Sequence, residues 1–161
     1  ESFERDTLVM AALGRATSSV DYVDAVERRH GHTRKLTSFF ESYDLLLTPT
    51  SATPPPKIGE FDLPVSLQRA ADVLLKTRTA RLLRYTKIVD DMVDNNLGWV
   101  PYTQLANLTG RPAISLPLHW TGDGLPLGVQ FVAPLAGESL LIQLAAQLEQ
   151  ALPWADRLAP I

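Results

Sequence analysis

Prolines interrupt the apolar runs in the last third of the sequence, and they restrict how those runs can lie in a sheet. The segment NLTGRPAISLPL, residues 107–118, places Pro112 and Pro117 in a run that otherwise has the composition of a buried strand. Proline has no backbone N–H, so a sheet tolerates it where a strand ends, at an edge or at a bulge. Pro126 and Pro134 flank the next apolar run. We therefore expect these prolines at strand ends, edges or bulges.

Three strands are predicted from turn signals and apolar runs. The turn TGDG joins the segments PAISLPLHW and LPLGVQFVAP, which predicts two antiparallel strands. Earlier in the chain, the short run DLLLTPT closes at Pro49 and predicts a buried strand that ends at a loop.

Helical periodicity marks three further segments. Residues 18–43 predict a long helix, which Ser18 and Asp21 open at a capping-box spacing. Residues 66–94 predict a second long helix, and GESLLIQLAAQLEQALPW predicts a C-terminal amphipathic helix with leucines four apart. Between them, GWVPYTQLANLTG predicts a loop and a short helix that Gly110 ends in the left-handed conformation. The predicted fold class is α/β, with two long helices, about three strands and the C-terminal helix.

Composition limits the partners of this chain. Its 161 residues are 45% hydrophobic and 20% charged, which suits one domain or one large piece of a domain. The 15 Lys and Arg and the 18 Asp and Glu form no long block of one sign, so we expect neither nucleic acid nor a membrane as a partner. The absence of cysteine excludes a disulfide framework and a cysteine nucleophile within these residues. With no secretion signal visible, the cytoplasm is the expected compartment.

The order of four segments is similar to a known family. DLLLTPTSATPPPKIGE, YTQLANLTGRPAISLPL, DGLPLGVQFVAP and GESLLIQLAAQLEQ follow one another within residues 18–154, and together they resemble the C-terminal portion of the amidase signature family. The resemblance implies that the strands belong to a mixed, twisted sheet with helices on both faces. It also implies a serine hydrolase that cleaves a small carboxamide through a Ser-Ser-Lys triad, without a cofactor.

The nucleophile that the resemblance implies lies outside this sequence. The family places it in an upstream stretch of the form GGSSGG, and no such stretch occurs here. The adjacent Ser18 and Ser19 lack flanking glycines and are better explained as a helix cap. No lysine has a serine partner at a suggestive spacing; the candidates are Lys35, Lys57, Lys76 and Lys87. We therefore expect no catalytic residue in residues 1–161, which would be the C-terminal segment of an amidase domain and inactive without its N-terminal portion.

Two groups of residues follow from the resemblance. Four polar residues would lie nearest the substrate, although the same side chains could simply hold the short helix and its turn together: Tyr102, Gln104, Asn107 and Thr109. The others are structural in either case: Pro49, Gly110, Pro112, Gly124, Pro126 and Gly128. Gly137 merely precedes a helix, so its replacement by alanine should be mild.

Metal binding has two weak signals in the sequence. The segment DDMVD, which runs from Asp90 to Asp94, has the acidic spacing that holds Mg²⁺ in isoprenoid synthases, but a solvated helix end explains it better. His30 and His32 lie two apart, so on a helix they point away from each other. We expect no metal site.

A second class of function stays open. The chain could be an independent, non-catalytic α/β module that binds a partner through an exposed sheet edge, and such an edge could also join copies into a homo-oligomer.

Overall fold

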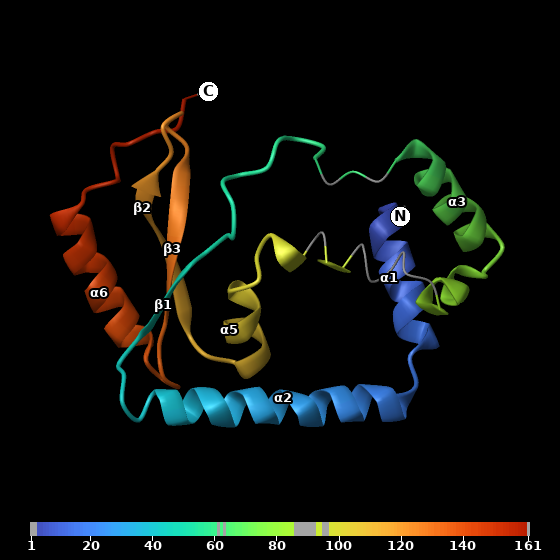
Figure 1. The fold of residues 1–161 in the computed structure, drawn as a ribbon, viewed down its shortest axis with the longest axis horizontal. Coiled ribbons are helices and arrows are strands. Elements are labelled where there is room, and N and C mark those ends of the chain that lie inside the picture. Colours follow the sequence, from blue (N-terminus) through green and yellow to red (C-terminus); the bar gives the residue numbers. More distant parts are fainter. Residues whose placement is uncertain (1–2, 61, 63, 86–92, 95–96, 161) are drawn as a thin grey trace. The chain divides into compact units, whose positions relative to one another are not determined.

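The fold is described from a computed structural model of the chain (Figure 1). The described residues are 3–60, 62, 64–85, 93–94 and 97–160. They divide into two compact units, Glu1–Val26 with Lys57–Leu97, and Glu27–Pro56 with Gly98–Ile161. No helix in the described part of the chain has the length and apolar character that crossing a membrane requires.

A three-stranded antiparallel sheet forms the centre of the second unit. Its strands are β1 (Leu46–Pro49), β2 (Ala113–Trp120) and β3 (Pro126–Val132), in the order β1-β3-β2. The antiparallel pairing of β2 with β3 confirms the prediction made from the TGDG turn. The predicted earlier strand is confirmed as β1, but it is not buried throughout, since the side chain of Leu47 is 61% exposed.

The ladder alternation explains the prolines within the strands. The N–H of Thr50 donates to Gly128 O at 2.9 Å, so the even-numbered residues of β3 turn their backbone polar groups toward β1. The register pairs Leu116 with Val129 on the other side of β3. By the same alternation, the nitrogens of Pro49 and Pro117 face the outer edges of β1 and β2, where no ladder bond is lost.

The remaining prolines lie where strands begin or end. Pro126 is the first residue of β3, and Pro112 precedes β2 while its carbonyl oxygen accepts from the Ala133 N–H at 3.0 Å. Pro134 follows the end of β3. The register of β2 also shifts between Leu116 and His119, around Pro117, so this strand has a bulge as well.

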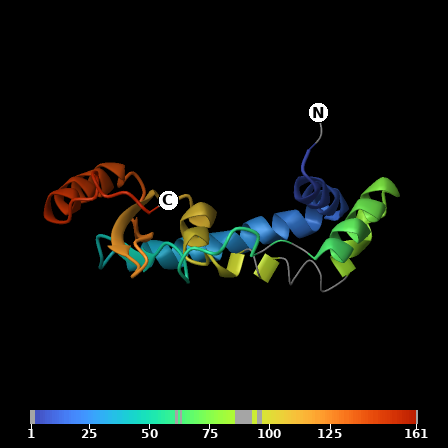
Figure 2. The same cartoon turned by 90° about the horizontal axis from the view of Figure 1, so that it is seen from above.

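The sheet carries a helix on each face (Figures 1 and 2). On one face α6 (Glu138–Ala151) packs its apolar stripe over β2 and β3, as the leucine spacing predicts. On the opposite face lies α5 (Thr103–Thr109). The α/β class is therefore confirmed. The buried core under α6 consists of Leu116, Phe131, Ala133 and Leu141.

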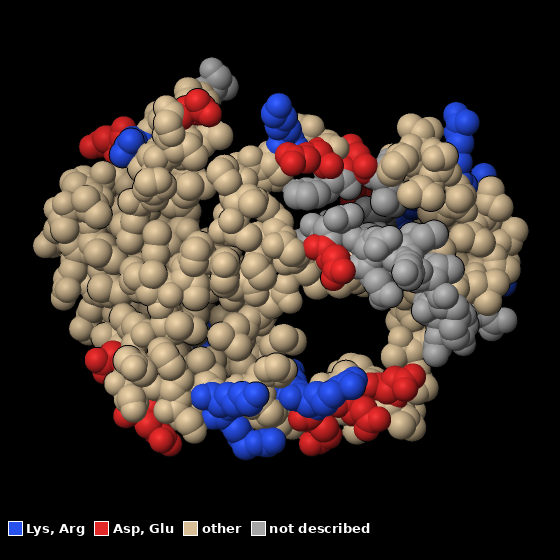
Figure 3. Space-filling model, in the orientation of Figure 1, with Lys and Arg blue, Asp and Glu red and all other residues tan. Residues whose placement is uncertain are grey.

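The predicted long helix is confirmed as α2 (Ser19–Phe39). Ser18 caps it, because its Oγ accepts from the Asp21 N–H at 3.0 Å. Leu36 is its buried residue, and most other positions are exposed. Charges of both signs lie along its surface (Figure 3), which is typical of a solvated helix.

The prediction of one continuous helix over residues 66–94 is wrong. The helix α3 (Val65–Lys76) ends first, and a 3₁₀ segment, η1 (Ala80–Tyr85), follows it. The Thr77 hydroxyl bonds back to Val73 O at 2.9 Å and meets the Thr79 hydroxyl at 2.7 Å. Arg78 between them has a φ of 57°, which a continuing right-handed helix cannot contain. Residues 86–92 of the predicted helix lie outside the described residues.

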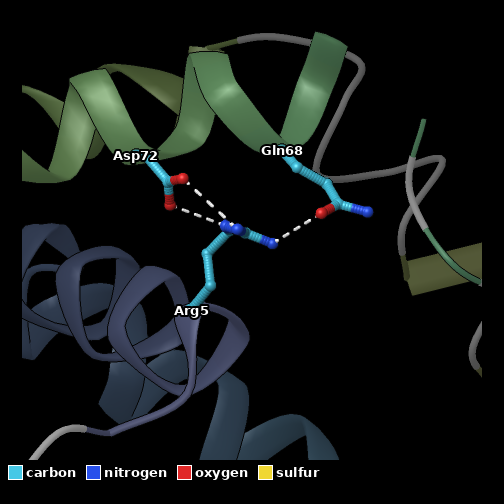
Figure 4. A network of polar contacts seen from close by, with 3 residues as sticks. All are labelled: Arg5, Gln68 and Asp72. Atoms are coloured by element: carbon cyan, nitrogen blue, oxygen red, sulfur yellow. Dashed lines mark hydrogen bonds and ion pairs between the residues drawn. The ribbon is translucent and has the colours of Figure 1, made fainter. Parts of the chain in front are cut away.

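The first unit also contains α1 (Arg5–Ala16), a helix that the sequence patterns did not predict. Its buried Val9 packs with Ala80 and Leu83. Figure 4 shows how Arg5 joins α1 to α3, with Nε donating to an Asp72 carboxylate oxygen at 2.6 Å and Nη1 to Gln68 Oε1 at 3.1 Å.

Candidate functional site

The short helix α5 places the residues expected nearest the substrate. Gly110 ends this helix with a φ of 66°, in the left-handed region that favours glycine. Tyr102 is 39% exposed at the helix start, Asn107 is exposed, and Gln104 is half-buried. Thr109 is buried, and its hydroxyl donates to Leu105 O at 2.6 Å. The Thr109 side chain therefore serves its own helix, whereas the side chains of Tyr102 and Asn107 are exposed.

A glutamine in the central strand joins α5 to the sheet. Gln130 is 4% exposed, and its Nε2 donates to Thr48 Oγ1 at 3.1 Å and to the backbone oxygen of Tyr102 at 3.3 Å. Burial makes these bonds costly to lose, because an unpaired amide loses its hydration without compensation. Sequence reasoning missed Gln130, although a single polar residue in the run GVQFVA was a usable signal.

Two hydroxyl groups meet beside the same strand. Thr50 Oγ1 and Ser115 Oγ lie 2.6 Å apart, on the face of the sheet that carries Gln130. They meet over Gly128, where a Cβ would overlap Ser115 Oγ and would lie 2.6 Å from Thr50 Oγ1. The sheet therefore presents a row of polar side chains toward the α5 side, and we call it the polar row: Thr48, Thr50, Ser115 and Gln130.

The other residues expected to be structural lie at turns and strand ends. Gly124 has a φ of 79° in the β2–β3 turn, where its N–H donates to Thr121 O at 3.0 Å. Pro49 is the last residue of β1 and Pro126 the first of β3.

Among the described residues, no hydrogen bond found joins a serine to a lysine, and Ser18 is engaged as a helix cap. Within the same residues no three His, Cys, Asp or Glu side chains are grouped to hold a metal ion. His30 and His32 are on α2, and the acidic segment 90–94 lies mostly outside the described residues. The chemistry that this arrangement offers is hydrogen bonding from polar side chains and a fixed backbone.

Comparison with known proteins shows which family this chain is similar to. A family model described as Amidase matches residues 2–142. A putative amidase of Mycobacterium leprae, AmiC, is 39% identical over 131 residues, which cover 81% of this chain and 23% of that protein. The 6-aminohexanoate-cyclic-dimer hydrolase of Paenarthrobacter ureafaciens is 39% identical over 115 residues, covering 71% of this chain and 20% of that protein.

Solved structures show the same likeness. The structure of 6-aminohexanoate cyclic dimer hydrolase with its substrate aligns at a TM-score of 0.62 and 33% identity, over 86% of this chain and 26% of that one. A glutamyl-tRNA(Gln) amidotransferase structure from Thermotoga maritima aligns at 0.59 and 25% identity, over 97% of this chain and 28% of that one. The 161 residues thus span only 20–28% of the length of these proteins.

Proposed function

The chain belongs to the amidase family, and from this we propose that residues 1–161 are the C-terminal segment of an amidase domain in a longer protein. That protein would hydrolyse a small carboxamide to a carboxylate and an amine or ammonia. The observation that carries the proposal is the family match over residues 2–142, together with relatives about three and a half times as long as this chain.

The proposed reaction takes place on groups outside these residues. A serine oxygen attacks the amide carbonyl, the C–N bond breaks as the leaving nitrogen takes a proton, and water then hydrolyses the acyl-enzyme ester. A lysine acting through a second serine supplies and removes the protons. Backbone donors outside this chain stabilise the oxyanion.

The role of this chain is to form scaffold and one wall of the pocket. Gln104 and Asn107 lie on α5, and Tyr102 immediately precedes it, where the buried Gln130 of β3 bonds to the Tyr102 backbone oxygen. The sequence before α5, Trp99 to Pro101, contains no carboxylate that could bind an ammonium group. We infer that the acyl group bound beside α5 is apolar or aromatic.

The first test compares the 161-residue chain with the longer encoded protein on simple aryl amides. The longer protein should turn them over and the 161-residue chain should not, because the nucleophile is missing. Ser18→Ala and Ser19→Ala in the chain are the controls. Activity of the chain that either variant abolishes would refute the proposal, as would a longer protein without amidase activity.

The second test addresses the pocket wall in the longer protein. Asn107→Ala should lower kcat/KM by about tenfold, because the proposal places this side chain against the substrate. The melting temperature should not change, because the Asn107 side chain is exposed and packs little against the protein. Gln147→Ala is the matched control, since it truncates an exposed amide on α6, on the other face of the sheet. Equal kcat/KM values for both variants would show that Asn107 does not line the pocket.

A further inference from the structure

A buried arginine joins the end of α2 to the turn between α5 and β2. Arg111 is 8% exposed, and its Nη2 donates to Thr37 Oγ1 at 2.6 Å. Its Cζ lies 5.6 Å from the ring centroid of Phe40, so the guanidinium group lies over an aromatic ring. Thr37 in turn donates to Thr33 O at 2.9 Å, within α2. Arg111 therefore links the end of α2 to the turn that leads from α5 into β2.

The charge of Arg111 is not compensated within the described residues. Its Nε is buried and bonds to none of them. The ion pair found among those residues is that of Arg5 with Asp72, and none involves Arg111. A hydroxyl group and an aromatic ring offset only part of the hydration that a buried guanidinium loses. The carbonyl groups at the end of α2 contribute a partial negative charge but not a full one.

We propose that Arg111 receives a carboxylate side chain from the part of the longer protein that lies outside these 161 residues. The fork of a guanidinium group suits a carboxylate, which can accept two parallel N–H bonds. The relatives extend far beyond the matched region, so the protein would contain chain that can supply an aspartate or glutamate. This inference rests on the proposal that the chain works within a longer amidase. It adds that Arg111 binds this chain to the rest of the longer protein, next to the C-terminal end of α5.

The test uses the longer protein without substrate, in a buffer free of carboxylic acids. Arg111→Met should lower the melting temperature by about 5 °C or more at pH 8, because it leaves a buried carboxylate without its cation. Burial and the loss of the cation raise the pKa of that carboxylate, so at pH 5 it takes up a proton. The deficit relative to wild type should therefore shrink by about half between pH 8 and pH 5.

Two further variants separate an ion pair from simple packing. Arg111→Gln keeps a donor for Thr37 and should show the same pH dependence. It therefore replaces Arg111→Met in the test if Arg111→Met does not fold. Thr37→Val removes the bond within the chain and leaves the charge pair, so its deficit should be equal at both pH values. A deficit of Arg111→Met and Arg111→Gln that does not change with pH would overturn the proposal.

Double variants test whether the carboxylate lies outside this chain. Glu41→Gln or Asp44→Asn, which alter the acidic residues that follow Phe40, should not abolish the pH dependence in the Arg111→Met background. If either does, the counter-charge is internal and the proposal is wrong. Amidase activity of the longer protein is measured separately. A protein without amidase activity could therefore still show the ion pair, and an active amidase could still lack it.

Discussion

Gly128 shows how one missing side chain shapes the polar row. The hydroxyl groups of Thr50 and Ser115 come from different strands and meet over this glycine at 2.6 Å. Any side chain at position 128 must push them apart, because both contacts are far shorter than van der Waals distance.

Gly128→Ala should therefore destabilise the protein by about 1–3 kcal/mol through overpacking. Gly31→Ala is the matched control, since it adds the same atom in the middle of α2, where nothing lies within 4 Å. The control should stabilise the helix by about 0.5–1 kcal/mol. Chemical denaturation measures both changes, and equal effects of the two substitutions would contradict the geometry around Gly128.

The Arg5–Asp72 pair gives a prediction about pH. A hydrogen bond from Arg5 is the main cause that lowers the pKa of Asp72 below its ordinary value of 3.8. A carboxylate with a lowered pKa adds stability that is present above its unfolded-state value and is lost as pH falls through its folded value. Because both side chains are partly exposed, the contribution is small.

Asp72→Asn should thus lower the melting temperature slightly at pH 7, by about 1–3 °C, with a difference from wild type that shrinks below about pH 3.8. Glu149→Gln, an exposed acid-to-amide change on α6, should have little effect at either pH. A difference for Asp72→Asn that grows as pH falls would contradict the assigned sign.

At the scale of elements, the end of α3 depends on a single strained backbone position. Arg78 has a φ of 57° between the hydroxyl-bonded Thr77 and Thr79. A left-handed conformation costs a non-glycine residue about 1–2 kcal/mol, and glycine adopts it freely.

Arg78→Gly should therefore stabilise the protein by up to about 1 kcal/mol, since the relief of strain exceeds the entropy lost by glycine. The same substitution at Arg69, inside α3, should instead destabilise it by about 1 kcal/mol. Urea denaturation measures the stability change of each variant, and opposite signs for the two Arg→Gly substitutions would support the break between α3 and η1. Equal losses of stability in both variants would contradict it.

At the scale of the whole molecule, the sheet has only three strands and two outer edges within the described residues. Pro49 and Pro117 reduce the donors on those edges, but they do not cover them. Large apolar side chains of the second unit are also exposed: Leu47, Leu135, Ile142, Leu152 and Leu158.

The 161-residue chain alone should consequently self-associate or aggregate, and light scattering at several concentrations would show a mass that rises with concentration. Leu47→Lys, which places a charge on the β1 edge, should reduce the association. A monodisperse monomer that unfolds cooperatively would instead favour an independent module.

Local chemistry in the sequence determined most of the elements. The Ser18 cap, the TGDG turn, the leucine spacing of α6 and the glycine that ends α5 each act within a few residues, so they could be found without coordinates. The prolines likewise predicted strand ends, edges or a bulge, because a missing N–H restricts the same residue in any fold. The family resemblance came from the order of these local segments.

Only the tertiary structure decided which distant residues meet. Gln130 bonds to Thr48 across 82 positions of sequence, and Arg111 reaches Thr37 across 74. The expectation that Gly137→Ala is mild is wrong for the same reason, since its Cβ would lie 2.8 Å from the Ala133 Cβ and from Pro134 O. Periodicity reports which face of an element is apolar, but it does not report which neighbour fills the space beside it. Burial of Arg111, and hence its need for a counter-charge, was decided by packing alone.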